Sequence, residues 1–442
     1  DDGAAEAGLK AALALRPENF EARFRLAEVL ARRFRFDEAR AVLEEVLAAD
    51  PANFTALYQI GVLHYLCDRY AEAVEWGRRA LAADPERKEV FDLIGLALVG
   101  CGRFAESAAC FADAARLAVP QAPAYASNQA FIPHYDPTRS ADDLLAVHRA
   151  WGERFGGRGD DPEARFANSP EPERRLRIGY LSPDLRAHSV AYFTIPLIAQ
   201  HDRAAFEVFA YSATDKPDRV TAWIAEHVDV WRDVMGMSAD AVRAAIAADR
   251  IDILVDLAGH TAGNLLPVLA RRAAPVQVTY IGYPDTTGVP AIDYRIVDAV
   301  TDPPGAADAR ATETLVRLPR PFLAYRPVPD RPPVGPGPIA DGAPFTFGSF
   351  NSALKLNEPL FEVWAEILRG VPGARLLLKA KQFAERTTRD WVSGAFAARG
   401  VDPARIEALG FQPTLGSHLE IYNRVDLALD TFPYNGTTTT CE

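Results

Sequence analysis

The most chemically suggestive part of the chain is a run of threonines close to its last residue. The segment is Tyr434-Asn435-Gly436-Thr437-Thr438-Thr439-Thr440-Cys441-Glu442, and the apolar run before it, residues 426–430, predicts a buried parallel strand. A glycine and several hydroxyl residues between a strand and a helix start form an anion site, because free backbone N–H groups and the helix dipole face the ligand. The alternative is an ordinary Thr-rich turn with one capping Thr.

Polar side chains also follow other predicted strands. The candidate site residues found in this way are His188, His260, Asn351 and Lys355, and the loop 282–288 has the same position after its strand. Ligands of open parallel sheets bind where the strands end. A lone His at a helix start is more often a cap than a catalyst. What favours a catalytic role for His188 is its position after a strand, on the side of the sheet where ligands bind.

The common phosphate and metal motifs are absent from the sequence. There is no D-x-D pair to hold a divalent metal on a nucleotide diphosphate, no G-x-x-x-x-G-K-[ST] and no G-x-G-x-x-G. A bound diphosphate would therefore have its charge met by Lys355, by backbone N–H groups and by the Thr run. We expect no metal and no cofactor.

Two stretches of the chain alternate short apolar runs with helical patterns, and residues 326–344 between them are rich in Pro and Gly. The predicted strands are 176–181, 206–211, 251–255 and 276–281, then 345–350, 375–379, 405–409 and 426–429. The predicted helices include 141–155, 358–369, 384–398 and 417–423. This alternation predicts two parallel sheets covered on both faces, with a cleft between the two domains.

A 34-residue repeat occupies the N-terminal part of the chain. Pro17, Pro51 and Pro85 lie 34 residues apart, and Pro120 is one residue off this register. This is the tetratricopeptide period, in which two antiparallel helices form each repeat and Pro follows the second. Residues 1–16 match the second helix of an earlier repeat, so we expect the chain to start inside a longer array.

Small residues recur in the repeats where the two helices should touch. They are Ala27, Gly61 and Gly95. Stacked repeats form a curved groove, so the array is expected to hold a protein or peptide. The alternative is a spacer or a dimerisation arm. The residues two positions before these small residues are Arg25, Gln59 and Leu93. They do not form a row of the same polar residue along the groove.

Composition bounds the class of protein. The net charge is 48 − 60 = −12, which argues against general nucleic-acid binding. There is no run of 18 apolar residues and no signal-peptide pattern, so no membrane span is expected. The four cysteines show no CxxC spacing, and three of them lie in helical patterns, where they are expected to be small buried residues in a reducing compartment. A cytoplasmic location is therefore expected.

The chain resembles the protein O-GlcNAc transferase family over nearly its whole length, and within it the SPINDLY branch. The segments that carry the resemblance are 181–184 with 188–190, 259–261, 282–284 with 286–288, 292–295, 347–351 with Lys355, 429–434 running into the Thr block, and 148–152 with 154–155. The resemblance implies an inverting, metal-independent glycosyltransferase of GT-B type that moves a sugar from a nucleotide diphosphate to Ser or Thr of proteins.

The resemblance also implies roles for single residues. Lys355 would hold the diphosphate and stabilise the leaving group, and His188 would lie at the reacting centre near sugar and acceptor. His418 matches a His near the nucleotide base, and Glu442 stands where the O-GlcNAc branch has an acid on the ribose. The nucleotide-sugar-binding set is completed by His260, Asn351, Thr437, Thr438 and Thr439.

The sequence leaves two donors open. Thr437 replaces a His that precedes the paired Thr in O-GlcNAc transferases, and plant SPINDLY proteins with this Thr block are fucosyltransferases that use GDP-fucose. UDP-GlcNAc is the expected donor, and GDP-fucose is the alternative. The alternative to an enzyme is a non-catalytic repeat scaffold whose α/β part only binds a nucleotide or a partner.

The expected domain organisation follows from these patterns. Three full repeats plus part of one occupy residues 1–119, a linker with one helix occupies 120–173, and a first Rossmann-like lobe occupies 174–325. A connection at 326–344 leads to the nucleotide-sugar-binding lobe at 345–442. We expect that second lobe to be truncated, because a helix should begin where the chain stops.

Overall fold

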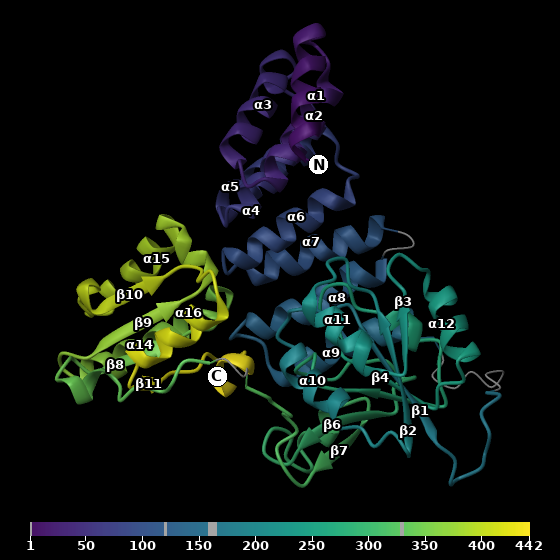
Figure 1. Ribbon diagram of the computed structural model, residues 1–442. Coiled ribbons are helices and arrows are strands. Elements are labelled where there is room, and N and C mark those ends of the chain that lie inside the picture. The colour runs from purple at the N-terminus through teal and green to yellow at the C-terminus, as the bar shows by residue number, and fades with distance from the viewer. Residues whose placement is uncertain (1, 119–121, 158–165, 328–330) are drawn as a thin grey trace. The chain divides into compact units, whose positions relative to one another are not determined.

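The computed structural model describes residues 2–118, 122–157, 166–327 and 331–442. Residues 1–125, 135–137 and 332–436 form one compact unit, and residues 126–134, 138–331 and 437–442 form another. The first unit contains the helical repeats and the smaller sheet, and the second contains the larger sheet (Figure 1). Pro120, residues 158–162 of the predicted linker and Pro329 lie outside the described residues.

The repeat array consists of paired helices of 13 or 14 residues. They are α1 (Asp2–Leu15), α2 (Phe20–Arg32), α3 (Phe36–Ala49), α4 (Phe54–Leu66), α5 (Tyr70–Ala83), α6 (Lys88–Gly100) and α7 (Phe104–Leu117). Pro17, Pro51 and Pro85 each stand two residues after a helix, at the end of α1, α3 and α5. The predicted helical repeat is therefore confirmed. No helix in the described part of the chain is long and apolar enough to cross a membrane.

Small residues lie where α6 and α7 meet, as predicted. A Cβ added to Gly95 would stand 2.9 Å from the ring of Phe111, which is fully buried. The Gly95 carbonyl also accepts a hydrogen bond of 2.7 Å from the Ser107 hydroxyl. The absence of a side chain at Gly95 thus lets the two helices approach closely.

The segment between the array and the larger sheet contains α8 (Ala122–Phe131), the 3₁₀ helix η1 (Ile132–Tyr135) and α9 (Ala141–Phe155). The helix predicted at 141–155 is confirmed. It begins with a capping box, in which Ser140 accepts from the backbone of Asp143 and Asp143 accepts from the backbone of Ser140.

The larger sheet has seven parallel strands among the described residues, in the order β3-β2-β1-β4-β5-β6-β7. They are β1 (Leu176–Ser182), β2 (Phe206–Ser212), β3 (Val230–Asp233), β4 (Ile253–Asp256), β5 (Val276–Thr279), β6 (Tyr294–Asp298) and β7 (Thr314–Leu318). The helices are α10 (Ala191–Ala199), α11 (Arg219–His227), α12 (Ala239–Ala248), α13 (Leu266–Leu269) and the 3₁₀ turn η2 (Asp308–Arg310). From β1 the successive strands β2 and β3 are added on one side, and β4 to β7 are added on the other. The point between β1 and β4 is therefore a topological switch point, where ligands of such sheets bind.

The smaller sheet has the order β10-β9-β8-β11, and all its pairs are parallel. Its elements are η3 (Pro338–Asp341), β8 (Thr346–Ser349), η4 (Ala353–Lys355), α14 (Glu358–Gly370), β9 (Arg375–Lys379), η5 (Lys381–Ala384), α15 (Arg386–Ala397), η6 (Pro403–Arg405), β10 (Ile406–Leu409), α16 (Leu415–Glu420), η7 (Ile421–Arg424) and β11 (Leu427–Ala428). Helical repeats followed by two parallel α/β sheets confirm the predicted fold class.

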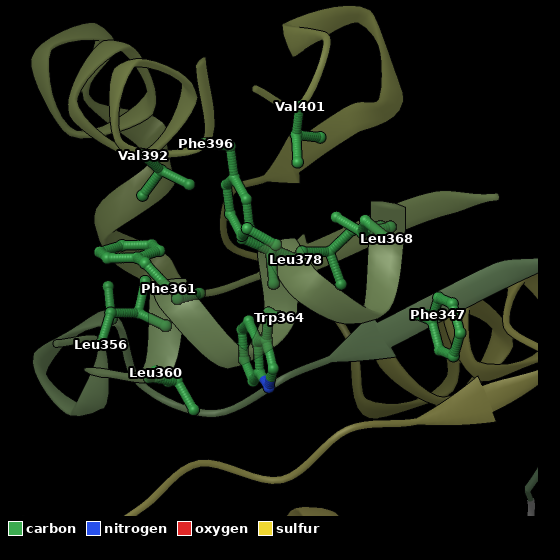
Figure 2. Close-up of a cluster of buried hydrophobic side chains, with 14 of the residues drawn as sticks. Phe347, Leu356, Leu360, Phe361, Trp364, Leu368, Leu378, Val392, Phe396 and Val401 are labelled. Carbon is green, nitrogen blue, oxygen red and sulfur yellow. The ribbon is translucent and has the colours of Figure 1, made fainter. Parts of the chain in front are cut away.

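One apolar cluster holds the smaller sheet to its helices. Figure 2 shows Phe361 and Trp364 of α14 beside Phe396 of α15 and Leu378 of β9. These four side chains are no more than 2% exposed. Burying an aromatic or Leu side chain contributes about 1.5–3 kcal/mol, so this cluster fixes the sheet from which Asn351 and Lys355 emerge.

Three details differ from the sequence-based expectation. The strand at 426–430 is shorter than predicted and is not buried, because it is the edge strand β11 and Leu427 is 51% exposed. The helix at 417–423 begins at Leu415 and changes to a 3₁₀ turn after Glu420. The strands β3, β6 and β7 were not predicted.

Candidate active site

Lys355 ends the 3₁₀ turn that follows β8, so its side chain starts at the carboxyl edge of the smaller sheet. Its amine donates a hydrogen bond of 2.6 Å to the carbonyl of Asn435 and lies 4.1 Å from the centre of the Tyr434 ring. Burial lowers the pKa of Lys355 to about 8, and the charge of Asp430 acts in the opposite direction. In the described part of the chain, no carboxylate forms an ion pair with this amine.

The loop after β11 is held by the Asp430 carboxylate. The oxygen Oδ1 accepts hydrogen bonds from the Asn351 side chain at 3.0 Å and from the backbone N–H groups of Thr431 and Gly436, both at 2.7 Å. Asn351 follows β8, so this carboxylate ties the ends of two neighbouring strands together.

A second set of contacts fixes the same loop from inside. The Thr431 hydroxyl donates to the carbonyl of Tyr434 at 2.8 Å, and the Asn435 side chain donates to the carbonyl of Thr431 at 2.8 Å. Asn357, which caps α14, donates to the carbonyl of Phe432 at 2.7 Å. The loop therefore presents the Tyr434 ring and the Asn435 carbonyl to Lys355 in one conformation.

His418 lies on α16 in the same unit, beside two aromatic rings. Its ring centre is 6.3 Å from that of Phe350, which follows β8, and 5.6 Å from that of Tyr422. Phe350 and Tyr422 are themselves 4.5 Å apart, edge to face. The unit thus places His418, Asn351 and Lys355 on elements that leave the smaller sheet after β8 and β10.

His188 stands in the turn between β1 and α10 of the other unit. Its Nδ1 is 3.7 Å from Oδ2 of Asp184, and the Arg186 guanidinium is 3.6 Å from the other oxygen of that carboxylate. Burial lowers the pKa of His188, while Asp184 raises it and Arg186 lowers it. Burial raises the pKa of Asp184, and His188 and Arg186 oppose that effect. His188 is 37% exposed at its side chain, so it can reach a ligand at this edge.

His260 has both ring nitrogens engaged inside the protein. Nε2 donates to the carbonyl of Thr287 at 2.7 Å, Nδ1 lies 3.1 Å from the Ser127 hydroxyl, and the residue is 1% exposed. Burial holds the pKa of His260 well below its ordinary value, so the ring is neutral. In this structure His260 holds the loop 282–288, and its direct contact with a nucleotide sugar stays a prediction.

The Thr run forms the helical turn α17 (Thr438–Cys441), and Thr437 stands at its N-cap position without a side-chain capping bond. The backbone of Cys441 donates to Thr437 and that of Glu442 donates to Thr438. Glu442 lies close enough to Tyr192 and Tyr325 for its charge to add to the effect of burial in raising the pKa of both phenols. Residues 437–442 belong to the unit that also contains His188.

Sequence reasoning missed the residues that hold these side chains in place. Asp184, Asp430, Asn357 and Tyr434 were not predicted as site residues. Asn357 carried a usable signal, since Asn before Glu and Pro is typical of a helix start. Asp184 was passed over although it lies only four residues before His188. Asp430 and Tyr434 could not be recognised, because their roles depend on contacts with residues far away in the sequence. No group of three or more metal-ligating side chains occurs within the described ranges.

Comparison with known proteins gives a consistent picture. Residues 161–325 match the family "Glycosyl transferase family 41", and residues 3–59 and 32–87 match tetratricopeptide repeat families. The chain is 43% identical over 319 residues to the "Probable UDP-N-acetylglucosamine--peptide N-acetylglucosaminyltransferase SPINDLY" of Petunia hybrida, which covers 71% of this chain and 34% of that protein. The SPINDLY protein of Arabidopsis thaliana is 42% identical over 305 residues, covering 68% of this chain and 33% of that protein.

A solved structure agrees over almost the whole chain. A mutant of the O-GlcNAc transferase of Thermobaculum terrenum is 34% identical, with a TM-score of 0.82, and the match covers 99% of this chain and 80% of that one. The chain belongs to the protein O-GlcNAc transferase family, in its SPINDLY branch. This family is one of glycosyltransferases, and the chain spans about a third of the length of the curated SPINDLY relatives it matches.

Proposed function

We propose that this member of the O-GlcNAc transferase family is an inverting, metal-independent protein O-glycosyltransferase. It transfers GlcNAc from UDP-GlcNAc to Ser or Thr of proteins held by the repeat groove. The observation that carries the proposal is the half-buried Lys355 amine, held by Asn435 two residues before the Thr run. The relatives support the donor, since the SPINDLY proteins named above are called UDP-N-acetylglucosamine–peptide N-acetylglucosaminyltransferases.

The chemistry of glycosyl transfer explains why such an amine matters. The sugar gains positive charge as the bond to the diphosphate breaks, and negative charge collects on the departing diphosphate. A cation fixed in advance stabilises that charge more strongly in a partly buried site than in water, without a cost of reorganisation in the transition state. Lys355 is proposed to fill this role, with the N–H groups and hydroxyls of Thr437, Thr438 and Thr439 as further donors.

The remaining candidates fit around this core of the proposal. His188 would face the sugar and the acceptor hydroxyl, and direct displacement by that hydroxyl would invert the anomeric centre. Asn351 and His418 would lie on the nucleotide side, and Glu442 on the ribose. The four free cysteines support a cytoplasmic location as part of the same proposal.

The donor is tested by incubating the purified chain with UDP-GlcNAc or GDP-fucose and candidate acceptor proteins, followed by intact-mass measurement. A gain of one N-acetylhexosamine supports the proposal, and a gain of one deoxyhexose supports the fucosyltransferase alternative, which Thr437 favours. Lys355→Ala should abolish the mass gain while the melting temperature stays nearly unchanged. Binding of both nucleotides with no transfer to any acceptor would instead favour a non-catalytic scaffold.

Metal independence has its own test. Because Lys355 and backbone N–H groups are proposed to meet the diphosphate charge, UDP should raise the melting temperature in the presence of EDTA as much as it does with Mg²⁺. A strict requirement for Mg²⁺ would overturn this part of the proposal.

A further inference from the structure

A line of aromatic rings leads from the repeat array to Lys355, within one compact unit. Phe104, the first residue of α7, stacks on Tyr135 of η1, with ring centres 6.4 Å apart and planes 13° apart. Tyr135 in turn lies against Tyr434, with centres 5.1 Å apart, and the Lys355 amine stands over the Tyr434 ring. The three rings come from the array, the connecting segment and the loop after β11.

The Tyr434 ring meets the Lys355 amine in a favourable geometry. An ammonium within about 6 Å of a ring centre is attracted by the π face, more strongly where water is excluded. The separation here is 4.1 Å, and both residues are at least half-buried. An ammonium has three N–H donors. One N–H donates to the Asn435 carbonyl, and another part of the ammonium faces the Tyr434 ring. The ammonium can therefore still donate a hydrogen bond to an anion.

The backbone around Tyr434 cannot easily take another conformation. Its carbonyl accepts from Thr431, and its neighbour Asn435 is bound through its side chain to Thr431. Tyr135 contacts the ring, and burial raises the pKa of the Tyr434 phenol to about 12, so the ring stays neutral at physiological pH. The groups that act on the amine are thus the Tyr434 ring, the Asn435 carbonyl and the Asp430 carboxylate.

We infer that Tyr434 is a positioning residue for Lys355, and that Tyr135 fixes the Tyr434 ring from the connecting segment. The inference rests on the proposed function in one respect, namely that Lys355 binds the diphosphate of the donor. It adds that the aim and the protonation of this lysine depend on an aromatic contact and on a residue outside the smaller sheet and its helices. A loss of the contact between Tyr135 and Tyr434 would therefore change the affinity for the donor.

The first test measures Lys355 directly and needs no ligand. The chain contains six lysines, so a ¹³C-lysine NMR titration of the whole chain resolves them, with Lys355→Arg to assign the signal. Tyr434→Phe keeps the ring and should leave the pKa of Lys355 near 8. Tyr434→Leu keeps the site apolar but removes the π face, which should lower that pKa by about 1. An unchanged or raised pKa in Tyr434→Leu would overturn the inference.

The second test measures binding of UDP by calorimetry across pH 6.5–9. Binding of UDP should weaken towards alkaline pH as Lys355 loses its proton. This alkaline limb of the pH profile should vanish in Lys355→Met. Tyr434→Leu should weaken binding by about 2- to 30-fold at pH 7.5 and move the limb to lower pH, whereas Tyr434→Phe should behave as the unmodified chain. Melting temperatures of all variants show that the fold is kept.

The two proposals fail in different ways. If the unmodified chain does not bind UDP, or if Lys355→Met binds it equally well, the proposed function fails while the NMR titration still decides on Tyr434. Suppose that the weakening of UDP binding at alkaline pH disappears in Lys355→Met but stays at the same pH in Tyr434→Leu. Lys355 then keeps its proposed role in binding, and the inference that Tyr434 positions it fails. Tyr135→Leu should move the limb in the same direction as Tyr434→Leu but by less, and no movement would remove Tyr135 from the inference.

Discussion

The Asn351 side chain donates a hydrogen bond of 3.0 Å to the Asp430 carboxylate, which joins the loops that follow β8 and β11. The same oxygen accepts from the backbone of Thr431 and Gly436. Asp430→Asn should therefore loosen the loop, because a neutral amide oxygen is a weaker acceptor than a carboxylate. We expect faster hydrogen exchange across residues 430–436, measured by mass spectrometry. Asn351→Ala removes only the side-chain donor and keeps the charge, so its effect should be smaller. Equal exchange in all three proteins would contradict this account.

The close approach of α6 and α7 gives a prediction about stability. Gly95→Ala would place a methyl group 2.9 Å from the Phe111 ring, which is held in the core of the array. Such overpacking should cost about 1–3 kcal/mol of unfolding free energy, measured by urea denaturation. Gly8→Ala is the matched control, because Gly8 is also helical but a Cβ there meets nothing within 4 Å. That change should stabilise by about 1 kcal/mol or less. Similar effects at both positions would show that packing at Gly95 is not the cause.

Some parts of this structure could be predicted from the sequence because they depend on local pattern. The prolines that follow α1, α3 and α5 and the helix α9 are of this kind, since spacing and capping residues define them. The strand β3 was missed because it is a short edge strand that ends in Arg232 and Asp233, without an apolar run. β11 was predicted as buried because its residues are apolar, but burial depends on which elements cover an edge.

The candidate site shows the same division. Lys355 and the Thr run could be named as candidates because each follows a predicted strand and carries a suitable functional group, and their roles stay predictions. Tyr434 and Asp430 could not be assigned a role, because Tyr434 acts on an amine that lies 79 residues earlier in the sequence and Asp430 binds a side chain at a similar separation. His260 was named for its position after a strand, whereas its contacts with Ser127 and Thr287 could not be read from the sequence, and its contact with a ligand stays a prediction.

Buried histidines around Tyr283 predict a loss of stability in acid. His148 is fully buried, and its ring nitrogens contact the Leu144 carbonyl at 2.6 Å and the Tyr283 hydroxyl at 2.7 Å. Burial lowers its pKa to about 4, whereas an unfolded His titrates near 6.5. Between these values the unfolded chain binds a proton that the folded chain does not, so stability falls as pH decreases from 6.5 towards 4. The loss from His148 alone is about 3 kcal/mol.

This acid effect can be assigned to His148 by its pH slope. Urea denaturation at several pH values from 7 to 4.5 gives the unfolding free energy at each. His148→Gln should be less stable than the unmodified chain at pH 7, because it disturbs the contacts with Leu144 and Tyr283. Because Gln does not titrate, this variant should lose less unfolding free energy on acidification. His227→Gln is the control for the substitution itself, at a His that is exposed on α11. An unchanged slope in His148→Gln would show that another group causes the acid sensitivity.

The pair of His188 and Asp184 predicts two opposite pKa shifts from two neighbouring substitutions. Asp184 raises the pKa of His188 and Arg186 lowers it, so Asp184→Asn should lower that pKa and Arg186→Gln should raise it. NMR titration of the His188 ring measures both without any substrate. If neutral His188 is the form that takes part in transfer, the acid limb of kcat/KM should move to lower pH in Asp184→Asn and to higher pH in Arg186→Gln. Ring titrations that shift while both activity profiles stay fixed would show that the protonation of His188 does not limit the reaction.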